Sequence, residues 1–189
     1  MLITAGPAIL LDNKVYLGNI NSDSMKISMI SVWFLFFGLV VHGQEQYLGK
    51  YTGELKIFNA NGIQSIPMEF HFLETNDPER FDYVLIYNNA PRNYTLIAQD
   101  KENGRYVLDE NNGIVLPTTY KDGVFYSLFE VQGSLLTSRI AFQADAADFE
   151  IMFSNTTDKT ITGGEEKDIP QVTGYPISVV QKARLARIQ

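Results

Sequence analysis

The chain has 189 residues, of which 45% are hydrophobic and 20% charged, so it can bury one sizeable core and is too short for two comfortable domains. Its formal net charge of −7 argues against a protein that binds the phosphate backbone of nucleic acids. It has no cysteine, which excludes disulfides, thiolate metal sites and thiol nucleophiles.

Residues 25–43 have the pattern of a signal peptide. Met25 and Lys26 are followed by an apolar run of about 15 residues, and small or medium side chains then precede Gln44, where cleavage is expected. The run is shorter than the roughly 20 residues of a membrane-spanning helix, although an uncleaved anchor is the alternative. We therefore expect export to the periplasm or the extracellular space, with no stable membrane span after cleavage.

Residues 1–24 show neither helical nor strand periodicity. The simplest interpretation is an over-long start assignment, with translation beginning at Met25. A genuine N-terminal extension is the alternative, and it would place the positively charged start of the signal in the middle of the chain. The mature protein is then expected to be a single domain of residues 44–189.

From Tyr47 onward the chain alternates between apolar and polar residues, which is typical of strands with one buried and one solvated face. Residues 47–58 and 63–72 predict two strands joined by the turn Asn59-Ala60-Asn61-Gly62. Similar runs follow at 81–87, 93–100, 105–110, 113–120, 124–131, 134–142 and 149–153. Short Xaa-Gly connections favour pairing of sequential neighbours. The sequence therefore predicts an all-β, antiparallel up-and-down meander of about nine to ten strands that closes into a barrel.

Two segments near the C-terminus interrupt or complete this pattern. Residues 154–174 are polar, acidic and glycine-containing, and they predict one long loop that could serve as a mouth or a lid. Residues 180–188 predict a last strand that pairs with the first and closes the barrel, with a C-terminal helix as the alternative.

A signal peptide followed by a Gly-aromatic strand and a long meander resembles the calycin group, which includes the lipocalins. Gly49-Lys50-Tyr51 stands where lipocalins carry Gly-x-Trp, with Tyr51 in place of the Trp. In that family an Arg from near the final strand packs over the Trp and closes the base of the barrel. The resemblance implies that Arg184 or Arg187 packs on Tyr51 as a cation–π pair.

Motifs of catalysis or cofactor binding are missing from the sequence. It contains no Gly-x-Ser-x-Gly, no His-Glu-x-x-His, no phosphate-binding glycine loop and no dinucleotide fingerprint. After cleavage the remaining histidine is His71, which alternation places beside Glu69 on the outer face. We therefore expect a non-enzymatic protein without a metal or a cofactor.

The inward face of the predicted barrel is rich in aromatic side chains, several of them tyrosines whose hydroxyls need partners when buried. The residues predicted to line a ligand site are Tyr51, Phe70, Phe72, Tyr83, Tyr87, Phe125, Phe129 and Phe142. This set fits either a barrel filled by its own side chains or an apolar cavity.

The function that we expect is binding of a small apolar or amphipathic ligand by an exported barrel. Two alternatives remain open at this stage. One is an envelope interaction module that recognises a protein or a glycan with a filled barrel, and the other is an enzyme built on a calycin barrel.

Overall fold

The computed structural model describes residues 43–166 and 168–188. The predicted extension of residues 1–24 and all but the last residue of the predicted signal peptide lie outside these ranges. Within them, no helix is both long and apolar enough to cross a membrane.

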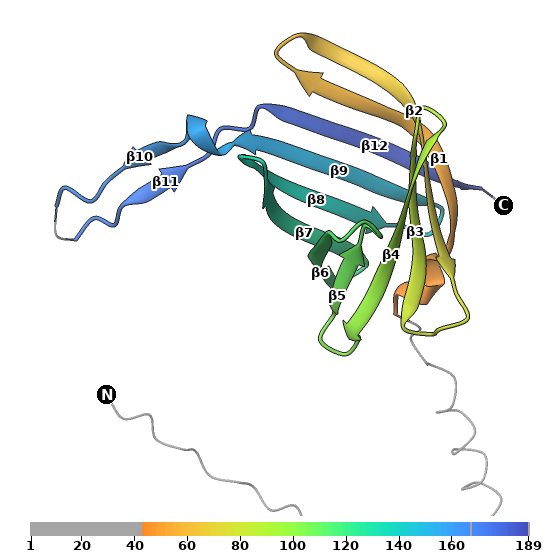
Figure 1. Cartoon of the computed structure of the whole chain (residues 1–189). Coiled ribbons are helices and arrows are strands. Elements are labelled where there is room, and N and C mark those ends of the chain that lie inside the picture. Colours follow the sequence, from red (N-terminus) through yellow and green to blue (C-terminus); the bar gives the residue numbers. More distant parts are fainter. Residues whose placement is uncertain (1–42, 167, 189) are drawn as a thin grey trace, which may run out of the picture. The chain divides into compact units, whose positions relative to one another are not determined.

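Ten strands form a closed antiparallel barrel (Figure 1). They are β1 (Gly49–Asn59), β2 (Gly62–Glu74), β3 (Arg80–Tyr87), β4 (Ala90–Asp100), β5 (Arg105–Asp109), β6 (Val115–Lys121), β7 (Val124–Val131), β8 (Ser134–Phe142), β9 (Ala146–Asn155) and β12 (Val179–Ile188). Around the barrel their order is β1-β12-β9-β8-β7-β6-β5-β4-β3-β2. The predicted all-β meander of nine to ten strands is confirmed.

The turns follow from residues that tolerate positive φ. Asn88 and Asn89, between β3 and β4, have φ of 48° and 64°, as a two-residue type I′ hairpin requires. Asp122-Gly123 and Gln132-Gly133 repeat this geometry between β6 and β7 and between β7 and β8. These turns connect neighbours directly, so the chain has no need of crossovers.

The last strand closes the barrel, as predicted, and the helical alternative is wrong. Strand β12 pairs with β9 on one side and with β1 on the other, where Tyr51 lies opposite Arg187. Alternation in the middle of β12 explains this choice, because Ala183 and Leu185 are buried while Lys182 and Arg184 are exposed.

The prediction of one long loop over residues 154–174 is wrong. Strand β9 continues to Asn155, a 3₁₀ turn (η2, Thr156–Asp158) follows, and β10 (Thr160–Thr162) pairs with β11 (Val172–Gly174). Figure 1 shows this hairpin extending away from the barrel wall. Each strand has only three residues and carries threonines, so the segment is polar enough to resemble a loop.

Candidate functional site: the interior of the barrel

One end of the barrel is filled by its own aromatic side chains. Phe72, Phe125 and Phe142 pack edge-to-face or stacked, with ring centroids 5.7–6.0 Å apart. Tyr51 and Phe70 extend the cluster, with both side chains fully buried and their rings 5.9 Å apart. Offset and edge-to-face contacts of this kind add to the burial of apolar area, so this end forms the rigid core.

A short 3₁₀ helix, η1 (Gln44–Tyr47), caps this packed end (Figure 1). Its Tyr47 ring stacks on Phe142 at 4.7 Å, and the Tyr51 hydroxyl donates to the Tyr47 carbonyl oxygen at 2.6 Å. The cap therefore joins the residues before β1 to the end of β8.

Arg187, at the end of β12, completes the cap. Its guanidinium donates to the carbonyl oxygen of Leu48. A Cβ at Gly49 would lie 2.8 Å from Nε of Arg187, so the guanidinium packs directly against this glycine. In the ladder, Arg187 lies opposite Tyr51.

The expected cation–π pair on Tyr51 does not form among the described residues. The contacts of that type there join Arg92 to Tyr87 and Lys101 to Phe81. Arg184 faces outward by alternation and pairs instead with Asp148 at 3.2 Å.

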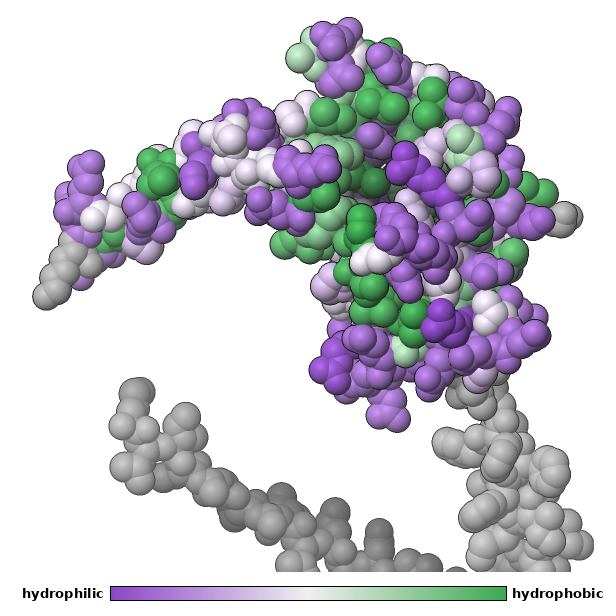
Figure 2. All heavy atoms as spheres, in the orientation of Figure 1, coloured by the Kyte–Doolittle hydropathy of each residue, from purple (hydrophilic) through white to green (hydrophobic). Residues whose placement is uncertain are grey.

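The other end of the barrel holds a cavity of about 490 Å³. This volume lies within the range of small-molecule sites. Its wall is mainly aliphatic and aromatic, with a few polar side chains. The lining residues are Leu55, Ile57, Ile66, Tyr83, Leu85, Tyr87, Arg92, Tyr94, Leu108, Glu110, Leu116, Phe129, Val131, Leu136, Ser138, Phe149, Ile151, Phe153 and Gln181. In Figure 2 the corresponding face is hollowed, with apolar side chains inside and hydrophilic ones around the rim.

The sequence-predicted aromatic residues divide between the two ends. Tyr83, Tyr87 and Phe129 line the cavity. The other five lie in the packed end and do not line the cavity: Tyr51, Phe70, Phe72, Phe125 and Phe142. The two interpretations left open by the sequence, filled core and open cavity, therefore each describe one half of the same barrel.

Five polar residues of the cavity were not found from the sequence: Arg92, Tyr94, Glu110, Ser138 and Gln181. Arg92 was missed because the predicted strand began at residue 93, whereas β4 begins at Ala90 and places Arg92 opposite the inward Leu85. The signal that could have found it is the alternation Arg92, Tyr94, Leu96, Ala98.

Burial controls the protonation of the cavity tyrosines. Desolvation raises the pKa of Tyr83 and of Tyr87 far above the ordinary value of 10.0, and the nearby Tyr94 adds to both shifts. Both hydroxyls are therefore neutral donors over the physiological pH range.

The wall beside the cavity is incompletely paired between β6 and β7. Only three residue pairs join these strands: Thr119↔Tyr126, Tyr120↔Phe125 and Lys121↔Val124. The hydroxyls of Thr118 and Ser127 bridge the next position at 2.9 Å. Pro117 lacks an N–H, which suits a strand that is unpaired on one side. Leu116 and Phe129, beyond the bridge, both line the cavity, so its wall is interrupted here.

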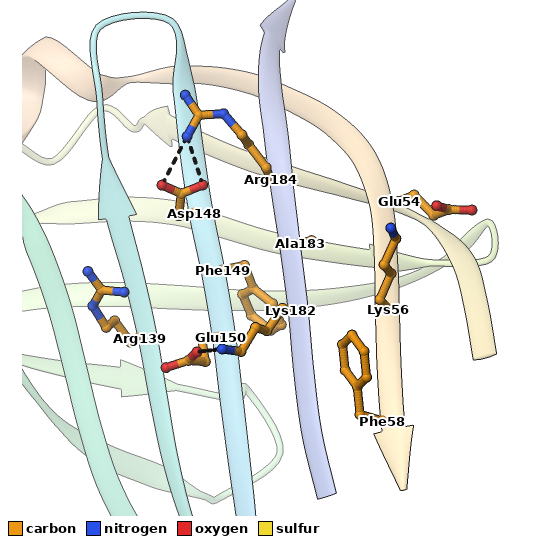
Figure 3. A pocket seen from close by; sticks show the side chains of 10 residues that line it. All are labelled: Glu54, Lys56, Phe58, Arg139, Asp148, Phe149, Glu150, Lys182, Ala183 and Arg184. Atoms are coloured by element: carbon orange, nitrogen blue, oxygen red, sulfur yellow. Dashed lines mark hydrogen bonds and ion pairs between the residues drawn. The ribbon is translucent and has the colours of Figure 1, made fainter. Parts of the chain in front are cut away.

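A second hollow of about 590 Å³ lies on the outside of the barrel, over β1, β12, β9 and β8 (Figure 3). Four of its seven charged side chains are paired, since Arg184 donates to Asp148 at 3.2 Å and Lys182 pairs with Glu150 at 2.9 Å (Figure 3). Exposed pairs of this kind contribute little to stability and are usual on a solvated sheet face. The smaller inner cavity, with its apolar wall, is the better candidate for a binding site.

Metal ligands do not converge in the part of the chain that the structure describes. There, no three His, Cys, Asp or Glu side chains are close enough together to hold an ion. His71 lies on the outer side of β2, beside Glu69 at 2.9 Å.

Together these features define a ten-stranded antiparallel meander barrel with one capped, aromatic end and one hollow end. A similar fold occurs in the crystal structure of a protein of unknown function from the DUF3598 family of Nostoc punctiforme. The TM-score is 0.56 at 10% sequence identity, over 77% of this chain and 49% of that one. The chain thus spans about half the length of that protein, and the likeness is one of fold alone. No protein-family model and no curated protein matches the sequence.

Proposed function

We propose that this protein is a non-enzymatic barrel that binds one small amphipathic ligand in the hollow end. The observation that supports this proposal is the cavity of about 490 Å³, with its apolar wall and its few inward polar side chains. Such a combination is typical of small-molecule sites. A lipocalin-like mode of binding agrees with the position of the cap and of Arg187 at the opposite end.

Ser138 and Thr137 provide a matched test on one strand. Ser138 lines the cavity, whereas Thr137 lies on the outer face. We expect the full chain to bind a neutral apolar dye such as N-phenyl-1-naphthylamine at one saturable site. Ser138→Phe should fill the cavity and abolish this site, while Thr137→Phe should keep it. Residues 1–42 are the same in all three proteins, so any dye bound there cancels.

Circular dichroism and the thermal midpoint of each variant would show that it is folded. Equal dye binding by folded Ser138→Phe and wild type would contradict the proposal. Native mass spectrometry of the protein from its natural host would complement this test, because a co-purifying molecule that is lost on denaturation would identify the ligand class.

We also propose that the protein is exported, on the strength of the sequence of residues 25–43. A chain that starts at Gln44 would retain every helix and strand of the barrel. The test is the N-terminal sequence of the protein recovered from the natural host. Gln44 is the expected first residue, and a start upstream of residue 25 in an unexported protein would contradict the proposal.

A second candidate function, contact with a partner protein in the envelope, is favoured by the β10–β11 hairpin. Its Ile161 and Val172 side chains are 55% and 54% exposed, and Figure 2 shows apolar side chains along it. A photo-crosslinker at residue 161 in the natural host should then capture one protein reproducibly, whereas one at Lys50, on the outer face of β1, should not. Equal capture from both positions would contradict this function.

A further inference from the structure

The polar side chains of the cavity gather mainly on one wall, which strands β3, β4 and the end of β5 form. Tyr83 and Tyr87 come from β3, Arg92 and Tyr94 come from β4, and Glu110 directly follows β5. Tyr83 lies opposite Tyr94 in the ladder, so these side chains share the inward face. The walls of the cavity opposite these polar side chains are mainly aliphatic or phenyl, apart from Ser138 and Gln181. A cavity divided in this way suits a ligand with one polar and one apolar end.

The tyrosines of this wall can donate hydrogen bonds to a ligand. Tyr83 is only 5% exposed and Tyr87 is half-buried, and the buried side-chain group that lacks a partner among the described residues is the Tyr106 hydroxyl rather than either of these. Both side chains line the cavity, so a ligand acceptor at this wall can take a hydrogen bond from each hydroxyl.

Arg92 provides the positive charge of the wall. Its guanidinium carbon lies 5.6 Å from the centroid of the Tyr87 ring, which holds the guanidinium within the mouth of the cavity. A side-chain hydrogen bond to Tyr94 is the largest cause that raises the pKa of Arg92 above its ordinary value, and an arginine is charged at any physiological pH. Arg92 makes no ion pair within 4.0 Å in the described ranges, where the arginine pairs are Arg105–Asp100 and Arg184–Asp148.

Glu110 limits the charge that the wall can accept. It lines the same cavity and interacts with Arg92 only through space, without an ion pair. For a doubly charged head group the attraction to Arg92 and the repulsion from Glu110 both double, whereas the cost of removing the head group from water rises more steeply with its charge. The guanidinium fork fits a carboxylate with two parallel hydrogen bonds. A singly charged carboxylate is therefore the head group that this wall fits best.

We propose that the ligand is an amphipathic carboxylate, whose head group accepts hydrogen bonds from Arg92 and from the hydroxyls of Tyr83 and Tyr87. Its apolar part occupies the remainder of the cavity, toward Leu136 and Ile151. This inference rests on the proposed function, and it adds the chemical class of the ligand.

Displacement of N-phenyl-1-naphthylamine from the full chain at pH 8 tests the inference with three 12-carbon compounds. Dodecanoate should bind about tenfold or more tightly than dodecanol, because a hydrogen bond to a charged group contributes more than one to a neutral group. Dodecylammonium should bind more weakly than either. Stronger binding of dodecanol or dodecylammonium than of dodecanoate would overturn the inference.

Substitutions in the polar wall of the cavity test whether its side chains cause the preference for dodecanoate. Arg92→Met keeps a long side chain without the charge, so it should reduce dodecanoate affinity about tenfold or more and leave dodecanol affinity unchanged. Arg139→Met, on the outer face, should change neither. Tyr83→Phe should weaken dodecanoate by a smaller factor, and Glu110→Gln should strengthen it. If Arg92→Met and Arg139→Met bind dodecanoate equally, the head group does not lie on Arg92.

The outcomes separate the two proposals. Dye binding that Ser138→Phe abolishes, combined with equal affinities for dodecanoate and dodecanol, would keep the proposed function and overturn the carboxylate. Dye binding that Ser138→Phe leaves intact would overturn both.

Discussion

Two buried tyrosines in the packed end differ in whether the hydroxyl has a partner. The Tyr51 hydroxyl donates to the Tyr47 carbonyl at 2.6 Å, whereas the Tyr106 hydroxyl is buried and has no partner among the described residues. Tyr51→Phe should therefore lower the free energy of unfolding by about 1 kcal/mol, and Tyr106→Phe should raise it by a similar amount. Urea unfolding of both variants measures this difference, and equal losses in the two would contradict it.

The buried hydroxyl of Tyr106 is also expected to make the free energy of unfolding depend on pH. Burial raises the pKa of Tyr106 from the ordinary 10.0 to about 12, with smaller contributions from Tyr120 and Glu45. The folded state then holds a proton that the unfolded state releases above pH 10, so the free energy of unfolding falls as pH rises from 10 to 12. Urea unfolding at pH 9 and pH 11 should show this fall, and the fall should be smaller in Tyr106→Phe. An equally steep fall in that variant would exclude Tyr106 as a cause.

At the level of strands, the alternation of apolar and polar residues was sufficient to predict each strand that has one buried and one solvated face. It located β1, β2 and the closing strand β12, because a shift by one residue would have exposed side chains such as Tyr51 and Leu185. It failed where that contrast is weak. Strands β10 and β11 are exposed along almost their whole length, and the first residues of β4 carry polar or small side chains. The candidate site was missed at Arg92 for this second reason.

Removal of the β10–β11 hairpin would test whether the segment after β9 is a lid over the cavity. None of its described residues lines the cavity, and Gly163 and Gly164, which follow β10, have positive φ of 73° and 78°. Replacing residues 159–175 with a short Gly-Ser linker should therefore leave the thermal midpoint within a few degrees and the dye affinity unchanged. Dye binding measured as in the cavity test gives the answer. A marked gain or loss of affinity would instead support the lid predicted from the sequence.

At the level of the whole barrel, side-chain size along the inward face separates the two ends. Inward positions near the cap carry phenyl and phenol rings that meet across the axis, as Phe72 and Phe125 do at 5.8 Å. Inward positions near the mouth include Leu55, Leu136 and Ile151, which leave space between opposite walls. The sequence showed which residues point inward. It could not show which of them meet, because that depends on how the strands are staggered around the barrel.

Closure of the barrel depends on the pairing of the first and last strands. Two arginines of β12 allow the contribution of this closure to the free energy of unfolding to be measured. Arg187 donates to the Leu48 carbonyl and covers Gly49, which links the end of the chain to the cap. Arg184 is 60% exposed in its side chain and pairs with Asp148 on the outer face. Arg187→Ala should lower the free energy of unfolding by about 1.5–3 kcal/mol, as expected for a hydrogen bond to a charged group. Arg184→Ala should lower it by less than about 1 kcal/mol.

Chemical unfolding of the two arginine variants beside the wild type measures both values on the same transition. The cap and the cavity lie at opposite ends of one barrel, so Arg187→Ala should weaken the fold while its folded population still binds the dye with unchanged affinity. If Arg184→Ala were the more damaging substitution, the outer ion pairs rather than the cap would hold β12 in place. If Arg187→Ala removed dye binding from a folded protein, the packed end would be needed to shape the cavity.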